Sequence, residues 1–170
     1  MIENESDKLH WYACKIYHNK MKDFKVQVAA CGFEHYIPMR IVSDNGIYAA
    51  GTEQPKRVPI IPSLIFVRAT DSFANGIRKN PAGYASVYCQ PGTSEPAIIR
   101  DDDMSTFIFV TTRELQTMEA VSPDLAKGDK VRITEGILKG AEGYITRIHG
   151  TRRFVVTVEG VAAVATTFIP

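Results

Sequence analysis

A chain of 170 residues can hold one ordinary domain or two small ones, and its 45% apolar content is enough for a packed core. The formal net charge of +1 gives no reason to expect indiscriminate binding to nucleic acid or to a membrane surface. Basic residues outnumber acidic ones from Lys127 onward and acidic residues prevail before it, which favours two modules.

The N-terminal segment M-I-E-N-E-S-D-K lacks the basic start and apolar stretch of a secretory signal, and no later segment approaches the length of a membrane span. We therefore expect a cytoplasmic protein without a membrane partner. Residues 11–17, W-Y-A-C-K-I-Y, predict a first strand. A helix is expected over residues 20–30, capped by Asn19 and stopped by Gly32.

Strand-like composition returns over residues 33–42, and S-D-N-G then begins a polar excursion to Pro55 that we interpret as a mobile hairpin or loop. The run S-L-I-F-V predicts a further strand, whose beginning Pro62 should mark. Asp71 or Ser72 is expected to cap a short helix through Ile77.

Residues 84–88 predict another strand. The acidic run D-D-D at 101–103 favours the start of a third helix, because negative charge is stabilising at a helix N-terminus. The apolar positions of that helix are Met104, Phe107, Ile108 and Leu115.

This order, βαββαβ with a hairpin in the middle, predicts an α+β fold of the split-βαβ type, in which helices cover one face of an antiparallel sheet. The other face would then be open to partners. Residues 120–126 predict a linker. Short apolar runs separated by glycine turns follow it and predict a small β-barrel. The expected domains are therefore residues 8–119 and 127–170.

The most informative segment of the sequence is G-D-K-V-R-I-T-E-G-I-L-K-G-A-E-G-Y-I-T-R-I, which begins at Gly128. Its glycines permit sharp loops, and Gly140 is expected to allow close backbone packing. The segment resembles the KOW motif, which implies an SH3-like barrel. The positions that carry this resemblance are Gly128, Asp129, Val131, Gly136, Gly140 and Gly143. A structural role is the favoured interpretation of these glycines.

Three segments of the first module, W-Y, F-E-H-Y-I-P and V-P-I-I-P-S-L-I-F-V, together resemble the N-terminal domain of NusG transcription factors. The resemblance implies docking on the clamp helices of the largest RNA polymerase subunit. The residues that it implies for this contact are Leu64, Phe66, Ile61 and Tyr12. Strand alternation alone allows either Leu64 and Phe66 or Ile65 and Val67 to face the core. Trp11 is expected in the core.

Similar proteins approach the nontemplate DNA with helix one, which makes Lys20 a candidate phosphate contact, with Arg78 and Lys79 as further candidates. Solvated helix lysines are the alternative interpretation. The last strand reads V-E-G-V-A-A-V-A where relatives carry F-G-R-x-T-P. This difference argues against contacts of this chain with Rho or a ribosomal protein, which the barrels of relatives make. The chain thus resembles operon-specific paralogues, which act as antiterminators on long operons such as surface-polysaccharide ones.

No metal-ligand spacing, phosphate loop, dinucleotide loop or nucleophile elbow occurs in the sequence, so we expect no enzyme activity, catalytic residue, metal or cofactor. An alternative function is a KOW-containing RNA-binding or ribosome-associated protein, in which Arg147, Arg152 and Arg153 grip phosphates. Nothing in the sequence demands more than a monomer.

Overall fold

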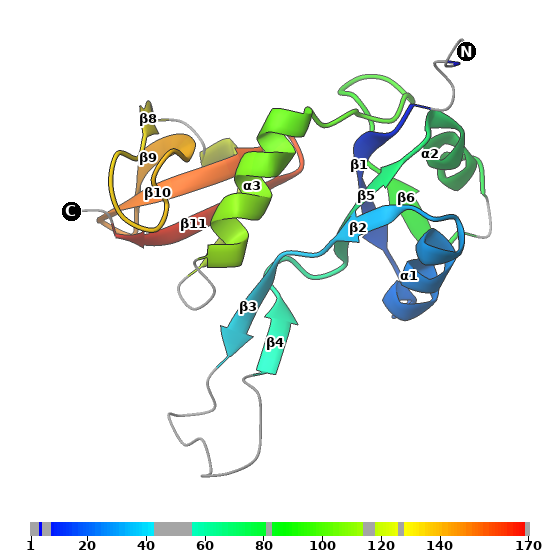
Figure 1. Cartoon of the computed structure of the whole chain (residues 1–170), viewed down its shortest axis with the longest axis horizontal. Helices are drawn as coiled ribbons and strands as arrows, with labels where there is room; N and C mark the ends of the chain where they lie inside the picture. Colours follow the sequence, from blue (N-terminus) through cyan, green and yellow to red (C-terminus); the bar gives the residue numbers. More distant parts are fainter. Residues whose placement is uncertain are drawn as a thin grey trace. The chain divides into compact units, whose positions relative to one another are not determined.

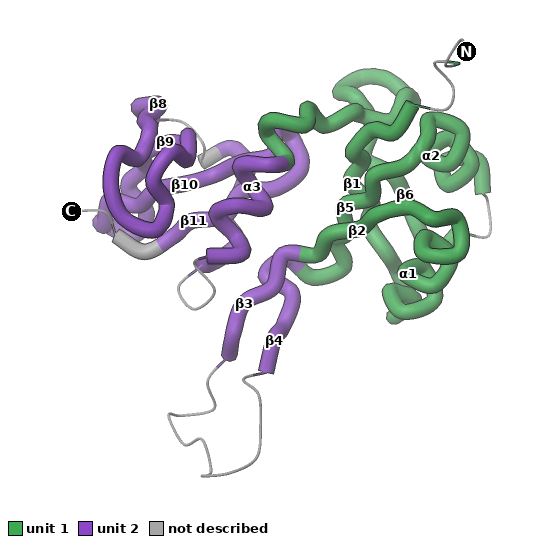
Figure 2. The backbone as a smooth tube through the Cα atoms, in the orientation of Figure 1, with its two compact units in different colours: residues 1–37, 62–104 green, residues 38–61, 105–170 purple. Residues whose placement is uncertain are grey.

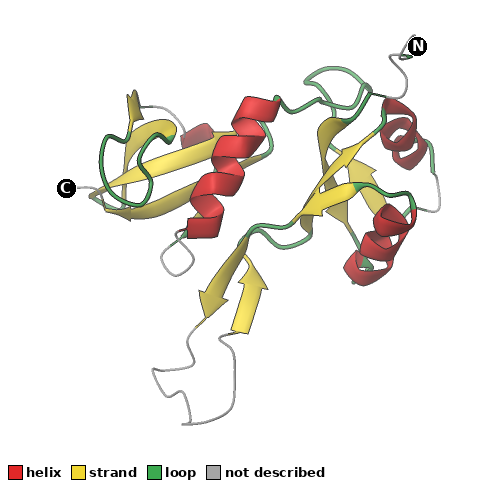
Figure 3. Cartoon of the chain, in the orientation of Figure 1, coloured by secondary structure: helices red, strands yellow, loops and turns green. Residues whose placement is uncertain are grey.

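The computed structural model describes residues 4, 8–42, 56–80, 83–113, 118–125 and 128–168. The chain divides into two compact units, residues 1–37 with 62–104 and residues 38–61 with 105–170 (Figure 2). The described residues include antiparallel sheets and three α-helices (Figure 3), which confirms the mixed fold class. The division differs from the expected domain limits in placing residues 38–61 and 105–119 with the second unit. Those limits stay a prediction.

The first unit contains a four-stranded sheet in the order β2-β5-β1-β6. Its strands are β1 (His10–Ile16), β2 (Glu34–Tyr36), β5 (Leu64–Ala69) and β6 (Ala85–Val87). Every neighbouring pair is antiparallel. Because the two long strands β1 and β5 lie in the centre, the sheet has the order that the split-βαβ plan requires.

Helices α1 (Met21–Ala30) and α2 (Asp71–Arg78) cover one face of this sheet (Figure 1). Their buried residues lie at helical spacing, so each helix directs one apolar stripe toward the strands. The resulting core combines strand residues such as Tyr12, Cys14, Ile65 and Val67 with helix residues Phe24, Val28, Ala74 and Ile77.

The caps of both helices differ from the sequence prediction. Asn19 has a left-handed backbone (φ 57°) and Lys20 takes the N-cap position of α1, without a side-chain cap hydrogen bond. The side chain of Thr70 caps α2 by accepting a hydrogen bond from the backbone N–H of Phe73 at 3.3 Å. Thr70 caps α2 because its backbone is still extended, whereas Asp71 is already helical. Gly32, with φ 73°, follows α1 as expected.

The single strand expected over residues 33–42 is divided at Pro38. β2 pairs with β5, whereas β3 (Met39–Val42) forms a hairpin with β4 (Lys56–Pro59). Proline has no N–H with which to continue a ladder. The carbonyl of Pro38 instead accepts a hydrogen bond from the N–H of Ile60 at 2.9 Å. The excursion predicted over residues 43–55 lies outside the described residues.

The third helix, α3 (Asp101–Arg113), begins at the three aspartates, as expected from the favourable interaction of acidic groups with a helix N-terminus. Met104, Phe107 and Val110 are fully buried along it. Leu115 lies outside the described residues.

The second unit contains a five-stranded antiparallel sheet in the order β7-β11-β10-β9-β8. The strands are β7 (Glu119–Val121), β8 (Asp129–Arg132), β9 (Glu142–Ile148), β10 (Thr151–Val158) and β11 (Ala162–Phe168). The strands expected after residue 127 are thus present. Closure into an SH3-like barrel stays a prediction.

Part of the segment expected as a linker is strand. Val121 pairs with Ala163, which places β7 at the edge of the five-stranded sheet. A short 3-10 helix, η2 (Pro123–Leu125), follows it. The sequence of three residues is too short to show strand periodicity, and pairing with β11 decides the outcome.

Candidate functional site

The register between β1 and β5 separates the candidate docking residues by sheet face. Ala13 pairs with Phe66 and Lys15 with Leu64, whereas Tyr12 pairs with Val67. Antiparallel partners project to the same side and successive residues to opposite sides. Leu64 and Phe66 therefore lie on the face opposite to the one that α1 and α2 cover.

That face is not exposed at these positions. The relative exposure of Leu64 is 2% and that of Phe66 is 0%, although the sequence predicted an open sheet face. Ile65 and Val67 are also buried, in the core beneath the helices. Because β5 is apolar on both sides, alternation in its sequence could not reveal its outward face. Ile61 is partly exposed.

Tyr12 is not brought together with Leu64 and Phe66, because it points into the helix-covered core. Its hydroxyl is buried and has no hydrogen-bond partner among the residues that the structure describes. Burial, with a smaller contribution from the charge of Asp71, raises the pKa of Tyr12 to about 12.

The aromatic residue of β1 on the Leu64 and Phe66 side is Trp11. It pairs with Arg68 and is buried, as expected, but it lies on the face opposite to the helices. Sequence reasoning missed this assignment because it depends on the strand register. The signal that could have found it is the two-residue spacing of Trp11 from Ala13.

The three candidate phosphate contacts are all exposed. Lys20 lies at the N-terminus of α1, where its Nζ is 3.2 Å from Oδ2 of Asp23. Arg78 ends α2 and Lys79 is its C-cap. The Asp23 carboxylate offsets part of the positive charge at Lys20.

A pocket of about 270 Å³ lies between α1, α2 and the segment that enters β6. Its apolar floor includes Phe24, Phe73 and Ile77. The hydroxyl of Tyr84 donates a hydrogen bond to Oε1 of Gln27 at 3.2 Å beside it. Sequence analysis did not predict this pocket, because its residues come from three separate segments.

The KOW-like glycines have two different structural roles. A Cβ on Gly128 would overlap the carbonyl oxygen of Ile145, and one on Gly143 would lie 2.6 Å from Cζ of Phe154. Gly140 has open space around it and a φ of 91°, so it is needed for its left-handed backbone. The expectation of close packing at Gly140 is wrong, since the close contacts occur at Gly128 and Gly143.

The other KOW-like positions lie in a turn and on β8. Gly136 has a φ of 84° in the turn before Leu138. Asp129 begins β8 and is exposed, and Val131 pairs with Gly143 of β9 while remaining partly buried.

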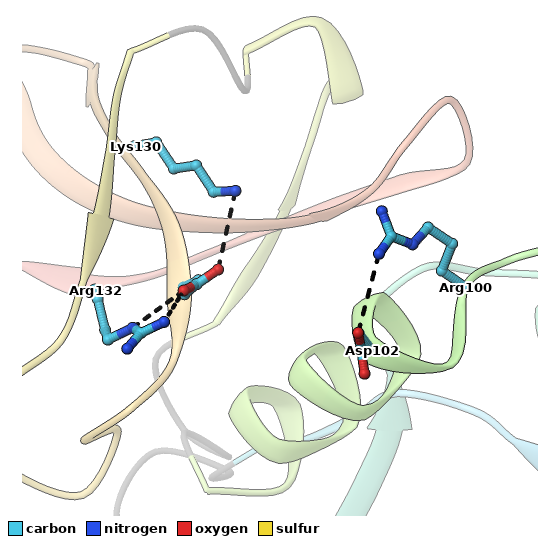
Figure 4. A network of polar contacts seen from close by, with 5 residues as sticks. Arg100, Asp102, Lys130 and Arg132 are labelled. Carbon is cyan, nitrogen blue, oxygen red and sulfur yellow. Dashed lines mark hydrogen bonds and ion pairs between the residues drawn. The ribbon is translucent and has the colours of Figure 1, made fainter.

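Strands β8 and β9 carry a compact set of ion pairs. Nε of Arg132 donates to Oε1 of Glu142 at 3.0 Å, and Nζ of Lys130 lies 3.9 Å from the other carboxylate oxygen (Figure 4). The hydrogen bond from Arg132, followed by the charges of Arg132 and Lys130, lowers the pKa of Glu142. Figure 4 also shows an ion pair at the start of α3, in which Nη2 of Arg100 lies 4.0 Å from Oδ2 of Asp102.

The three arginines of the RNA-binding alternative have different surroundings. Nη1 of Arg153 lies 2.8 Å from Oε1 of Glu119, and its guanidinium also donates to the carbonyls of Ala165 and Thr166. These contacts tie β10 to β7 and β11. Arg147 of β9 and Arg152 of β10 are exposed, and they lie opposite each other in the register of the two strands.

The described residues contain no group of three or more His, Cys, Asp or Glu side chains that could hold a metal ion. None of their helices combines the length and apolar character needed to cross a membrane.

Comparison with known proteins gives one family. Residues 9–108 match the family model described as "Transcription termination factor nusG". The match covers β1 through most of α3, and therefore the four-stranded sheet with both of its covering helices. No curated protein matches the chain.

Proposed function

The chain belongs to the NusG family of transcription factors, and we propose that it binds RNA polymerase through its first module and promotes processive transcription. The binding partner would be the clamp helices of the largest polymerase subunit. Such a factor acts by binding the elongating state more tightly than competing states, which requires no covalent chemistry. Members of this family are transcription factors rather than enzymes, and no cofactor is expected.

The observation that carries this proposal is the apolar face formed by Trp11, Leu64 and Phe66, opposite to α1 and α2. Once exposed, an apolar face of this kind would stabilise a complex by the removal of its area from water. Because Leu64 and Phe66 are buried, binding through them requires a state in which this face is exposed. Polymerase would then shift the population toward that state by its differential affinity.

The second module is proposed to be a KOW-type, SH3-like barrel, with domain limits at residues 8–119 and 127–170. Four consecutive small or medium residues of β11, Ala162, Ala163, Val164 and Ala165, are buried. This strand differs from the corresponding segment of general elongation factors. We therefore propose an operon-specific antiterminator that serves long operons, such as surface-polysaccharide ones, and whose barrel makes other contacts than those with Rho or a ribosomal protein.

Co-purification tests the main proposal against its alternative. A tagged full-length chain should retain RNA polymerase, and the purified complex should read through a terminator more often than polymerase alone. Retention of ribosomes without polymerase would contradict the proposal and favour the KOW-containing RNA-binding or ribosome-associated alternative.

Photocrosslinking tests the contact surface without disturbing the buried face. A photoreactive residue at position 61, which is partly exposed, should crosslink to the largest polymerase subunit. The matched control is Val26 on α1, which is 64% exposed and outside the proposed contact. Equal crosslinking from both positions, or crosslinking from position 26 alone, would contradict the proposed surface.

Contacts of Lys20, Arg78 and Lys79 with nontemplate DNA are a separate proposal, tested by charge-removing substitutions in an upstream-fork binding assay.

A further inference from the structure

The sheet face that holds Trp11, Leu64 and Phe66 has a positively charged side chain at each of its two ends. Arg68 pairs with Trp11 and Lys15 pairs with Leu64, so both basic residues project to this face. Leu64 and Arg68 are four residues apart on β5, a separation of about 13 Å. Lys15 is exposed and Arg68 is partly exposed, whereas the apolar residues between them are buried. The charges are therefore the part of this face that a partner meets first.

Arg68 has an acidic neighbour on the same face, but the contact between them is long. Glu34 of β2 pairs with Arg68 in the strand register, and its Oε2 lies 3.9 Å from Nη1 of the guanidinium, which is beyond hydrogen-bonding distance. The side chains of Arg68 and Glu34 are 41% and 63% exposed, and an ion pair of this kind contributes little to stability. Glu34 therefore holds the guanidinium only loosely.

The Nε atom of Arg68 is buried and has no hydrogen-bond acceptor among the residues that the structure describes. A buried donor without an acceptor is costly, and a charged donor is more costly than a neutral one. The state that exposes Leu64 and Phe66 also brings Nε within reach of a partner, because Arg68 lies on the same face. An acceptor supplied by that partner would remove the cost.

Lys15, at the other end of the face, forms no ion pair with a carboxylate among the described residues. Its Nζ lies 5.5 Å from the centroid of the exposed Tyr17 ring, and a cation over such a ring stays accessible. Within strands β1, β2, β5 and β6, this face carries Lys15 and Arg68 against a single acid, Glu34. The face is therefore apolar at its centre and positive at its ends.

We propose that Arg68 and Lys15 bind carboxylate groups on the polymerase surface that docks on Trp11, Leu64 and Phe66. This inference rests on the proposed polymerase contact, and it assigns an acidic character to the partner segment. A guanidinium binds a carboxylate with two parallel hydrogen bonds, for which Nε and one Nη of Arg68 form an edge. The apolar centre supplies the buried area, while the flanking charges orient the partner and speed its association. A phosphodiester chain has no apolar area to match this centre, which favours a protein partner.

Binding of the full-length chain to core RNA polymerase, without nucleic acid, tests this assignment. Association and dissociation rates would be recorded over a series of salt concentrations. Arg68→Gln should weaken binding about 10- to 100-fold, the loss expected for a hydrogen bond between charged groups. Lys15→Gln should mainly slow association and flatten its salt dependence, because an exposed charge at the rim of an interface acts on the encounter. Glu34→Gln should strengthen binding, because it removes the acid that competes for Arg68.

A charge swap separates docking from folding. The double substitution Glu34→Arg, Arg68→Glu keeps the ion pair but moves its positive charge from β5 to β2. It should melt at the same temperature as the unchanged chain and lose at least as much polymerase binding as Arg68→Gln. The matched control is Lys25→Gln, since Lys25 is exposed on α1, which covers the opposite side of the sheet. That variant should bind polymerase as tightly as the unchanged chain.

Charge reversal on both proteins identifies the partner group. Arg68→Glu should abolish binding, because it places a carboxylate opposite the acidic partner segment. Each acidic residue of the clamp helices would then be replaced by lysine in turn, and one of these replacements should restore binding of the Arg68→Glu chain.

Four results would overturn the inference. They are equal binding of Arg68→Gln and the unchanged chain, weaker binding of Glu34→Gln, an equal loss in the Lys25→Gln control, and a lack of rescue at every acidic position. An effect of Arg68→Gln confined to elongation complexes would assign the cation to nucleic-acid phosphates instead.

Failure of the inference and failure of the proposed function are distinguishable. If the unchanged chain does not bind core polymerase, the proposed function is wrong and the inference fails with it. If the unchanged chain binds and Arg68→Gln binds equally well, the polymerase contact stands and only the role of the charges is wrong.

Discussion

Gly143 packs against Phe154 so closely that a Cβ at position 143 would lie 2.6 Å from Cζ of the ring and 2.5 Å from the carbonyl oxygen of Val155. The ring of Phe154 is fully buried, and the carbonyl belongs to the backbone of β10. Neither neighbour can move freely. The close packing of β9 against β10 therefore requires a glycine at position 143 of the KOW-like segment.

Gly143→Ala should therefore lower the free energy of unfolding by about 1–3 kcal/mol, the usual cost of inserting a methyl group into a packed core. Denaturant unfolding followed by circular dichroism measures it. The control is Gly76→Ala, since Gly76 lies in α2 with open space around the added methyl group. That change should raise stability by about 0.5–1 kcal/mol. An unaffected Gly143→Ala protein would show that the strands can separate without cost.

Arg153→Met should lower the free energy of unfolding by about 1–3 kcal/mol, because it removes the guanidinium that donates to the carbonyls of Ala165 and Thr166 and to the Glu119 carboxylate. The adjacent Arg152→Met is a matched control, since that side chain is exposed, and should change stability by at most about 0.5 kcal/mol. A double-mutant cycle with Glu119→Gln isolates the ion pair. Equal effects of the two methionine substitutions would contradict the anchoring role of Arg153.

Phe66→Ala should cost about 3–5 kcal/mol and Leu64→Ala about 2–5 kcal/mol, because both side chains are buried and their loss leaves cavities. Thermal unfolding measures both, with the exposed Val26→Ala as the control. Aspartate at either position would bury an unpaired charge and should unfold the first unit. Loss of polymerase binding in such variants would therefore be uninformative. Unchanged stability in the alanine variants would show that the face is open in solution.

Tyr12→Phe should raise stability by about 1 kcal/mol near neutral pH, because it removes a buried hydroxyl without a partner among the described residues. In the unchanged chain, the folded-state pKa is raised to about 12 from an ordinary value of 10.0. The stability associated with this shift is present below pH 10 and is lost as pH rises toward 12, since the unfolded state ionises first.

Stability profiles of Tyr12→Phe and the unchanged chain should accordingly diverge further above pH 10. Urea unfolding at a series of alkaline pH values provides the comparison, and ultraviolet absorbance follows the phenol directly. Parallel profiles across this range would mean that the Tyr12 hydroxyl is hydrated in the folded state.

Local sequence determined the succession of elements. Apolar spacing located α1, capping candidates located α2, and the three aspartates located the start of α3. Runs of β-favouring residues located β1, β5, β6, β9 and β10, because these signals are all properties of neighbouring residues. Turn chemistry at Gly32 was equally local. The joint order of the segments in the first module also carried the NusG resemblance, which the match over residues 9–108 confirms. The KOW resemblance of the second module stays a prediction.

Tertiary structure decided what each side chain faces. β5 is apolar at every position from Leu64 to Val67, so only its register with β1 places Leu64 and Phe66 away from the helices and Tyr12 among them. Pairing with β11 converted part of the expected linker into β7, and Pro38 divided one expected strand between two partners.

The surroundings of the three arginines near the β9–β10 turn could not be predicted from the sequence either. Arg147, Arg152 and Arg153 are equivalent in the sequence, as three basic residues near one turn. Pairing of β9 with β10 sets the first two opposite each other, and pairing of β7 with β11 brings Glu119 to the third. Sequence thus determined which residues form each element, while long-range strand pairing decided which charges are neutralised and which remain available, because electrostatic partners are set by distance in space.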